Sequence, residues 1–521
     1  MRGANEPENV VVLDGGTLTL DQLVAIARRD ATVAIAEAAV TRITDSRHVI
    51  DQLIRDGVAV YGVTTGFGAL QDHVIAPDQL ELLQENIILS HSAGVGAELP
   101  RDAVRAMMAL RVNTFAKGFS GVRRELVESL VALINNDVIP VVPLQGSVGS
   151  SGDLAPLAHM ASVLIGHGRA YYRGEKFSGA QALQAAGIAP QVLQAKEGLA
   201  LTNGTQFMTA VGALALADAY NLAKCADIAA GLTLEALKGR SAPFREEVSL
   251  LRDHKGHAQV AENIRALTVG SHLIDCADRD TVGKIQDAYS LRCVPQVHGA
   301  SRGAFDYAFH TLIVEMNSVN DNPLVLAGQV GICSAGNFHG QPVALALDHL
   351  ALAASELGNI SERRCARLLD NRDNRGLPPF LILDSGLNSG LMIAQYTAAA
   401  LVSENKSLAH PASADSVPTS ANQEDHNSMG SIAARHARAV VDNVTNILAI
   451  EILCACQALD FRIEDGLHPG GGTAAAFAAV RDVVPKMEHD REIHGDILNV
   501  ARLVADGALV GAVEAQVGSM Q

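Results

Sequence analysis

The chain of 521 residues contains no tryptophan, and aromatic residues make up only 4% of it. Charged residues are also few, at 19%, while apolar residues reach 48%. A chain of this length and apolar content can bury a large core, which excludes intrinsic disorder as its main state. Because alanine, leucine and valine are conspicuous and aromatic residues are scarce, we expect packed helices rather than an aromatic-rich β-sandwich. The sequence therefore predicts a mostly α protein.

The seven cysteines form an odd set that contains no Cys-x-x-Cys spacing. This pattern favours neither a disulfide framework nor a zinc site, and it fits a reducing cytoplasm. Forty basic against 57 acidic residues leave a formal net charge of −17, with no block of lysine and arginine. A nucleic-acid partner is therefore not expected, because it would require a positive surface. The amino end has no basic head followed by an apolar core, so nothing marks the chain for export.

Common cofactor motifs are missing as well. The sequence has no phosphate-binding loop, no His-Glu-x-x-His pair and no Gly-x-Gly-x-x-Gly opening a βαβ unit, so chemistry with ATP, zinc or NAD is not expected. We assign no metal to the histidines, and we interpret the glycine run 470–472 as a flexible turn. Residues 198–217 carry no charge, but the polar run Asn-Gly-Thr-Gln at 203–206 argues against a membrane span. This stretch predicts a loop and a core helix.

Apolar spacing predicts several helices. Residues 122–134 have an i, i+4 apolar stripe with charged residues on the other face, which is typical of an amphipathic surface helix. Pro342 can stand in the first turn of a helix running to about Asp370. Residues 429–460 are apolar on most faces, as expected at the centre of a bundle or an oligomer. We expect a mixed amino-terminal portion, 1–143, and a helical portion, 144–521.

The segment 145–160, QGSVGSSGDLAPLAHM, carries the most chemical information. Small residues surround Ser151, and Gly152 follows it, so the backbone could fold tightly enough for the Gly152 nitrogen to reach the carbonyl carbon of Ser150. Loss of water from that ring and from the Ser151 side chain would leave a methylidene-imidazolone (MIO), an electron-poor alkene made without an external cofactor. Taken alone, the same residues also fit an ordinary turn or helix cap.

Other segments of the chain favour the MIO interpretation over an ordinary turn, because the sequence resembles the aromatic amino acid ammonia-lyase family. Within that family it is most similar to the histidine-specific bacterial members. The matching segments keep the family's order and span most of the chain: YGVTTGFG from Tyr61, LSHSAGVG from Leu89, GSVGSSGDLAPLAHM from Gly146, EGLALTNGTQ from Glu197, QDAYSLRCVPQ from Gln286, NDNPL from Asn320, GNFHG from Gly336, GLPPF from Gly376 and SANQEDH from Ser420.

The resemblance implies a long antiparallel helix bundle, similar to the fumarase and aspartase assembly, in a cytoplasmic homotetramer with shared active sites. It implies an MIO group formed from Ser150, Ser151 and Gly152, and elimination of ammonia from L-histidine to give trans-urocanate. Two alternatives stay open. One is action on tyrosine or phenylalanine, as an ammonia-lyase or a 2,3-aminomutase. The other is a catalytically inactive relative that serves as a binding or structural protein.

Roles near the reacting atoms are carried over from the family by motif. Tyr61 matches the tyrosine expected to be the base, although a phenol with its usual pKa of about 10 is a poor base at neutral pH. Tyr289 is the second phenol, near the amine or the prosthetic group. Arg292 matches the arginine that binds the substrate carboxylate, for which a planar guanidinium is suited. The remaining matches are polar or packing groups of the site: Asn203, Gln286 and Phe338.

Substrate choice rests on Ser90, His91 and Glu424, which resemble residues of the histidine-specific members. A carboxylate and a histidine can pair with the two nitrogens of an imidazole, whereas a phenyl ring would leave both without partners. Taken alone, Glu424 could instead cap the helix that starts near Met429. The chain departs from most relatives at Ser150, where alanine is usual. Cyclisation uses only the backbone carbonyl there, so the hydroxyl should not prevent it.

Overall fold

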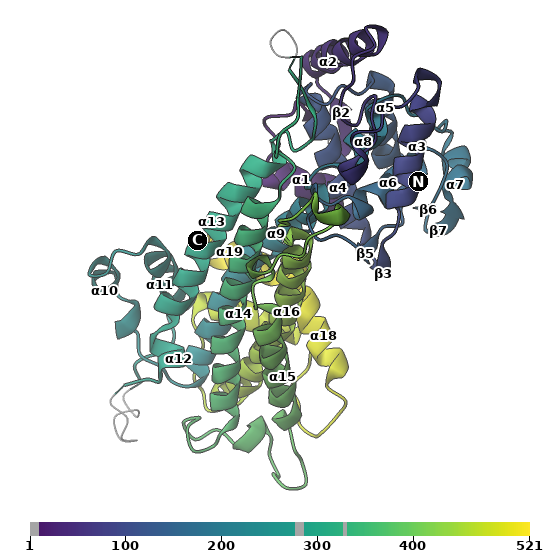
Figure 1. Ribbon diagram of the computed structural model, residues 1–521. Coiled ribbons are helices and arrows are strands. Elements are labelled where there is room, and N and C mark those ends of the chain that lie inside the picture. Colours follow the sequence, from purple (N-terminus) through teal and green to yellow (C-terminus); the bar gives the residue numbers. More distant parts are fainter. Residues whose placement is uncertain (1–9, 277–285, 327–330) are drawn as a thin grey trace. The chain divides into compact units, whose positions relative to one another are not determined.

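The computed structural model describes residues 10–276, 286–326 and 331–521, and these are mostly helical, as predicted (Figure 1). The chain divides into two compact units. Unit 1 comprises Met1–Leu214, Ala308–Asp348 and Pro411–Arg435, and unit 2 comprises Ala215–Tyr307, His349–His410 and His436–Gln521. Four of the five boundaries between the units fall inside helices α9, α13, α14 and α16, whose bounds are given below, and the fifth lies between His410 and Pro411. The predicted division near residue 143 stays a prediction.

Unit 1 combines helices with short strands. Strands β1 and β2 pair in parallel, β3 with β5 and β8 with β9 pair antiparallel, and β4, β6 and β7 form an antiparallel sheet. The elements are β1 Val10–Leu13, α1 Leu20–Arg28, β2 Thr32–Ile35, α2 Glu37–Arg55, η1 Gly68–Leu70, η2 Pro77–Gln79, α3 Leu80–His91, β3 Val95–Glu98, α4 Arg101–Ala116, α5 Arg124–Asn135, β4 Ile139–Pro140, β5 Pro143–Gln145, α6 Ala155–Leu164, β6 Arg169–Tyr172, β7 Glu175–Ser178, α7 Gly179–Ala186, α8 Glu197–Thr202, β8 Leu324–Leu326, β9 Gly331–Cys333, η6 Ala412–Ala414 and η7 Ser420–Asn422.

Helix α4 forms the centre of the amino-terminal part of unit 1 and packs against α1 and α5. Nearly all of its residues are buried, because small and flexible apolar side chains line most of its faces. Helix α5 buries one face only, through Leu126, Leu130 and Leu133 among others, which agrees with the amphipathic pattern predicted for residues 122–134. Thr19 begins α1 with a capping box that it shares with Gln22.

Unit 2 is built from helices. Its elements, together with the parts of four helices that begin or end in unit 1, are α9 Gln206–Ala236, η3 Ala242–Phe244, α10 Glu246–Leu250, α11 Lys255–Leu267, α12 Tyr289–Arg292, α13 Val294–Met316, α14 Gln341–Leu369, η5 Pro379–Leu381, α15 Met392–Leu408, α16 Gly430–Glu464, α17 Gly471–Arg481, α18 His494–Ala505 and α19 Ala508–Val517.

Polar side chains tie the long helices of unit 2 together. Gln395 near the start of α15 donates to Glu362 near the end of α14 at 2.6 Å, as expected for consecutive antiparallel helices. The side chains of Asn443 in α16 and Asn405 in α15 are joined at 2.9 Å. Thr233 in α9 donates to Glu451 in α16 at 2.7 Å. These bonds agree with the predicted helix bundle.

The two longest apolar segments form the predicted helices. Helix α14, Gln341–Leu369, agrees with the prediction of a helix from Pro342 to about Asp370, and α16, Gly430–Glu464, contains the segment predicted as 429–460. Both are long and apolar enough to cross a membrane by length and composition alone, but 72% of each apolar window is buried inside the protein. Their apolar character is therefore explained by packing within the core.

The glycine run 470–472, predicted as a flexible turn, is instead the N-cap and the first two residues of α17. The Gly470 amide donates to the buried Glu235 carboxylate at 2.8 Å. A Cβ atom on Gly470 would lie 2.6 Å from the Thr268 carbonyl carbon. The glycines therefore permit close packing of two segments, which local turn propensity does not reveal.

Candidate active site

A cavity of about 740 Å³ in unit 1 brings together side chains from distant parts of the sequence. The loop before η1, the end of α3, the turn before α6, the break between α8 and α9 and the loop before α16 all contribute to its wall. Six of the residues proposed from the sequence line it: Tyr61, Ser90, His91, Ser151, Asn203 and Glu424. A concave, mostly apolar site with a few converging polar groups is typical of a small-molecule site.

The Ser150-Ser151-Gly152 segment forms a tight turn at this cavity. Ser151 and Gly152 both have positive φ, at 48° and 81°. A Cβ atom on Gly152 would clash with the Gly204 carbonyl oxygen, so glycine is required there. The Gly204 amide donates to the Ser151 carbonyl at 3.3 Å, and the Asp153 amide donates to the Gly204 carbonyl at 2.7 Å. The turn is thereby tied to the loop that carries Asn203.

Asn203 lies where the helical chain breaks between α8 and α9, as the polar run at 203–206 indicated. The buried Arg111 guanidinium donates to the Asn203 carbonyl and, at 2.8 Å, to the Gln206 side chain. Burial lowers the pKa of Arg111 to about 10. The Asn203 amide donates to the Asn322 carbonyl at 3.0 Å, but its buried Oδ1 has no hydrogen-bond partner in the described part of the chain. An unpaired buried acceptor beside a cavity is expected of a ligand-binding group.

The Glu424 carboxylate reaches the same turn from the loop before α16. Its Oε2 accepts hydrogen bonds from the hydroxyls of Ser150 and, at 2.8 Å, Thr419. Its Oε1 lies 3.5 Å from the Ser151 hydroxyl oxygen. Thr419 and Glu424 also form an antiparallel bridge around the short turn η7, in which all three residues have positive φ. This geometry contradicts the alternative that Glu424 merely caps the following helix.

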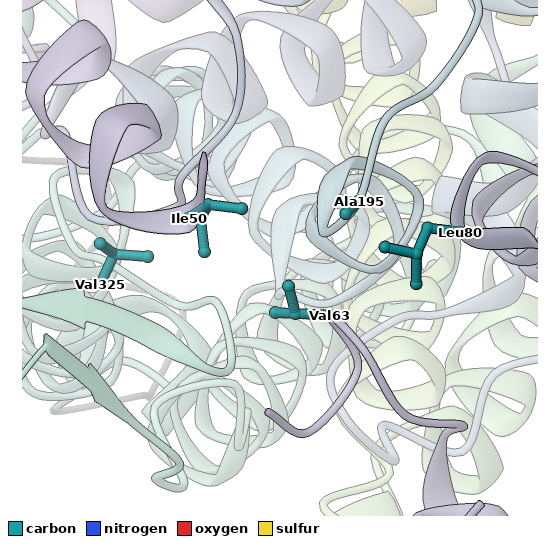
Figure 2. Close-up of a cluster of buried hydrophobic side chains, with 5 residues drawn as sticks. All are labelled: Ile50, Val63, Leu80, Ala195 and Val325. Carbon is teal, nitrogen blue, oxygen red and sulfur yellow. The ribbon is translucent and has the colours of Figure 1, made fainter. Parts of the chain in front are cut away.

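Tyr61 is held in a loop whose neighbouring Val63 is fully buried. Val63 belongs to an apolar cluster with Ile50, Leu80, Ala195 and Val325, shown in Figure 2. The Tyr61 hydroxyl oxygen accepts a hydrogen bond from the Gly68 amide at 3.2 Å. Burial raises the pKa of Tyr61 above its usual value, and the nearby Glu424 charge acts in the same direction, while the Gly68 hydrogen bond opposes both. The apolar cluster thus positions a phenol that ionises reluctantly in the single chain.

Ser90 and His91 end α3 at the cavity wall. The Ser90 hydroxyl lies 3.0 Å from His91 Nδ1, which fixes the orientation of the imidazole. Burial lowers the pKa of His91, whereas the negative charge of Glu424 acts in the opposite direction. A largely neutral imidazole offers one donor and one acceptor, so His91 can pair with a polar ring in the cavity.

Six other candidates are not among the residues that line this cavity, and two of them, Ser150 and Gly152, belong to the turn described above. Gln286, Tyr289 and Arg292 belong to unit 2, and Phe338 lies half-buried just before α14. The Tyr289 side chain is 70% exposed, and the Arg292 guanidinium lies 4.5 Å from the centre of the Tyr289 ring. Arg292 also donates from Nε to the Asp287 carbonyl at 3.1 Å. Of these two groups proposed to touch substrate, Tyr289 is therefore exposed and Arg292 is half-buried in a single chain.

Sequence reasoning missed three residues that support the site. Thr419 and Arg111 orient Glu424 and Asn203, as described above. Asp153 is fully buried and accepts hydrogen bonds from the Phe207 amide at 2.7 Å and the Ser431 hydroxyl at 2.9 Å. Burial raises the pKa of Asp153 to about 7. Asp153 follows the Ser-Ser-Gly turn directly, but its partners are distant in sequence, so the motif did not indicate its role.

No group of three or more His, Cys, Asp or Glu side chains that could hold a metal ion occurs among residues 10–276, 286–326 and 331–521. The groups that converge on the cavity are hydroxyls, amides, the two imidazoles of His73 and His91, and one carboxylate. Such a set can bind a polar ring, donate to developing negative charge and accept a proton.

Comparison with known proteins identifies the family of the chain. The profile of the aromatic amino acid lyase family matches residues 18–482. The chain is 52% identical to histidine ammonia-lyase of Caldanaerobacter subterraneus subsp. tengcongensis, over 96% of this chain and 97% of that protein. It is also 52% identical to histidine ammonia-lyase of Symbiobacterium thermophilum, over 97% of this chain and 99% of that protein. The chain therefore belongs to the aromatic amino acid lyase family, which is a family of carbon-nitrogen lyases.

Solved structures give the same result. Histidine ammonia-lyase from Trypanosoma cruzi superposes with a TM-score of 0.90 at 45% identity, covering 98% of this chain and 96% of that one. Tyrosine aminomutase from Streptomyces globisporus superposes with a TM-score of 0.92 at 39% identity, covering 98% and 100%. Both comparisons cover nearly the whole chain, so the predicted fold class is confirmed.

Proposed function

We propose that this protein eliminates ammonia from L-histidine to give trans-urocanate. The observation that carries the proposal is the placement of Glu424 and His91 on one cavity beside Ser151. An imidazole substrate presents one nitrogen donor and one acceptor, and both of these residues can pair with them. A phenyl substrate would leave the carboxylate and the histidine desolvated without partners. The identity of about half the residues with two histidine ammonia-lyases supports the same substrate.

The electrophile belongs to this proposal. Ser150, Ser151 and Gly152 would condense through a bond from the Gly152 nitrogen to the Ser150 carbonyl carbon, with loss of two water molecules, to form MIO. The residues fit this group, because the turn already has positive φ at Ser151 and Gly152 and excludes any side chain at Gly152. The unpaired Asn203 Oδ1 lies on the same wall. When formed, MIO supplies an electron-poor centre without an external cofactor.

The chain's own residues would bind the substrate and move its proton. Glu424 and His91 hold the imidazole, with Ser90 fixing the His91 ring. Tyr61 takes the proton from the substrate β-carbon at its phenol oxygen, where the Gly68 amide stabilises the phenolate. Asn203 holds a polar group of the bound substrate, Gln286 holds another from the segment that a second copy of the chain would supply, and Phe338 packs near the site. Because burial and Glu424 raise the pKa of Tyr61, we expect activity to increase towards alkaline pH.

Assembly into a homotetramer would complete the site. Arg292 would bind the substrate carboxylate and Tyr289 would lie near the amine, both from another copy of the chain. The exposure of Tyr289 in the single chain supports this. Co-expression of Tyr61→Phe with Arg292→Met chains tests it: mixed oligomers should regain activity that each variant lacks alone. A stable active monomer, or no recovery in mixed oligomers, would contradict shared sites. None of the seven cysteines, all of which lie in the described residues, forms a disulfide bond, which supports a cytoplasmic location.

The second candidate is a tyrosine or phenylalanine ammonia-lyase or 2,3-aminomutase. The likeness to tyrosine aminomutase from Streptomyces globisporus is the observation that favours it. The purified protein should be incubated with histidine, tyrosine and phenylalanine in turn, with chromatography of the products. Urocanate from histidine alone supports the proposal, whereas aryl-acrylates or β-amino acids support the alternative. An intact mass without loss of two waters, together with no turnover, would indicate an inactive relative.

A further inference from the structure

The Ser150 side chain offers a feature that ring formation does not use. Cyclisation consumes the backbone carbonyl of Ser150 but leaves its hydroxyl in place. That hydroxyl is buried and donates to Glu424 Oε2. We propose that Ser150 and Thr419 are positioning residues that hold one oxygen of the Glu424 carboxylate, so that the other oxygen faces the cavity and selects an imidazole substrate. This inference rests on the proposed function.

The hydroxyls of Ser150 and Thr419 both donate to the same carboxylate oxygen of Glu424. A serine or threonine hydroxyl has a single hydrogen to donate. Thr419 Oγ1 lies 2.8 Å from Glu424 Oε2 and 3.3 Å from Ser150 Oγ, so the shorter contact to the carboxylate takes its hydrogen. The Asn427 amide donates to Thr419 Oγ1 at 3.3 Å and thereby leaves that hydroxyl free to act as donor. Oε2 consequently receives two hydrogen bonds.

The other carboxylate oxygen of Glu424, Oε1, has no short hydrogen bond within the described residues. Glu424 Oε1 faces only the Ser151 hydroxyl, at 3.5 Å, among the hydrogen bonds of the described residues. Dehydration of Ser151 would remove that hydroxyl. Oε1 would then be a charged acceptor beside the cavity, able to receive the N–H of an imidazole. The arrangement leaves one oxygen anchored and the other available.

The backbone restricts the remaining freedom of Glu424. The Thr419 amide donates to the Glu424 carbonyl at 2.9 Å, and the Glu424 amide donates to the Thr419 carbonyl at 3.3 Å. The Ser420 hydroxyl accepts from the Ala69 amide at 3.3 Å, which ties this loop to the loop that carries Tyr61. Because the backbone is held, the remaining motion is rotation of the Glu424 side chain, and the hydrogen bonds from Ser150 and Thr419 restrict it. Loss of either hydroxyl should therefore weaken histidine binding more than it slows the chemical step.

Kinetics of Ser150→Ala, Ser150→Thr and Thr419→Val test the proposal. Ser150→Ala and Thr419→Val should each raise KM for histidine about tenfold, as expected for loss of a hydrogen bond to a charged group, while kcat changes less. Ser150→Thr keeps a hydroxyl and should restore most of the affinity. In a Glu424→Gln background, either substitution should have a much smaller effect. Thr44→Val removes a half-buried hydroxyl that serves its own helix in α2, and it is the matched control.

A binding measurement separates this inference from ring chemistry. In a Ser151→Ala background, where no ring forms, urocanate affinity measured by calorimetry should fall about tenfold on adding Ser150→Ala or Thr419→Val. Unchanged affinity and unchanged KM in both variants, with a strong effect of Glu424→Gln, would overturn the positioning role. Absence of histidine turnover by the unmodified protein would overturn the proposed function instead. If Ser150→Ala fails to fold, Thr419→Val decides the question, because it leaves the ring-forming residues untouched.

Discussion

Two buried carboxylates of unit 2, Asp227 and Glu451, are fully paired, whereas two polar groups at the cavity of unit 1, Glu424 and Asn203, are not. In unit 2, Asp227 accepts from His298 Nδ1 at 2.7 Å and from Arg302 at 2.5 Å, so that each of its oxygens is paired. Glu451 accepts from Arg364 through both oxygens, at 2.5 and 2.7 Å. Burial of such charges is tolerated when pairing and hydrogen bonding compensate for lost hydration. These residues hold helices α9, α13, α14 and α16 in register.

The polar groups of unit 1 at the cavity are incompletely paired. Glu424 Oε1 has one long contact, and Asn203 Oδ1 has no hydrogen-bond partner within the described residues. Both side chains line the cavity, whereas the paired carboxylates of unit 2 are fully buried. At these four residues, full pairing occurs where helices pack and incomplete pairing occurs at the cavity, as expected of groups that bind a ligand. Substitutions in the two regions should therefore affect different properties.

The largest effect is expected at the turn in unit 1. Ser151→Ala should prevent the loss of two water molecules from the chain and reduce kcat at least about 10³-fold, because stabilisation of developing charge is usually the largest catalytic contribution. Intact mass and histidine turnover measure both changes. The thermal midpoint should stay near that of the unmodified protein, because the Ser151 hydroxyl makes only a long contact of 3.5 Å with Glu424 Oε1. Retained activity in Ser151→Ala would refute the proposed electrophile.

Tyr61→Phe should lower kcat about 10²- to 10⁴-fold, the usual range for a lost general base. Since the pKa of Tyr61 is raised, the activity of the unmodified protein should rise with pH as the phenolate forms. Glu424→Gln removes one cause of that raised pKa, so the rising limb of its residual activity should move to lower pH. Rate measurements across pH would check this. An unmoved limb would mean that another group sets the profile.

In unit 2 the effect should be on stability. Arg364→Met leaves the buried Glu451 carboxylate without its main partner and should lower the free energy of unfolding by about 3–5 kcal/mol. Selectivity for histidine over phenylalanine should not change in the folded fraction. Denaturant unfolding and substrate competition measure the two quantities. As a control, the double substitution Arg364→Met/Glu451→Leu should recover much of the stability; failure to do so would show that lost packing, not the unpaired charge, dominates.

The smallest effect, taken per pH unit, is expected at Asp153. Its pKa in the folded chain, about 7, exceeds the usual 3.8, so the folded state binds a proton that the unfolded state has lost between these pH values. The stability that this proton contributes is complete below about pH 4 and is lost as pH rises through about 7. Asp153→Asn should remove this decline, which is less than about 1.4 kcal/mol per pH unit. Identical pH dependence of thermal unfolding in both proteins would contradict the raised pKa.

Much of the fold could be predicted because it follows local patterns. The end of α14 was predicted to within one residue and Pro342 was placed in its first turn, since apolar spacing and a proline in the first turn are properties of neighbouring residues. The break before α9 was indicated by the polar run at 203–206. The start of α17 was not, because its glycines serve contacts with Glu235 and Thr268, far away in the sequence.

The candidate site could also be predicted only in part from the sequence. Motif residues such as Tyr61 and Glu424 could be proposed because their segments resemble a family, and six of the proposed residues line one cavity. Thr419 and Arg111 could not, since their roles depend on hydrogen bonds to Glu424 and Asn203 that only the folded chain creates. No local pattern marks a threonine or an arginine that orients another side chain.

The amino-acid sequence by itself determined the helical architecture and the chemical groups available for catalysis, because helix formation and motif identity depend on residues close along the chain. Only the tertiary structure decided which oxygen of Glu424 accepts two hydrogen bonds and which has a single long contact. It also decided that Asn203 keeps an unpaired acceptor and that Tyr289 stands exposed. These properties arise from contacts between segments hundreds of residues apart, where burial and hydrogen-bond geometry, rather than residue type, determine what each group can do.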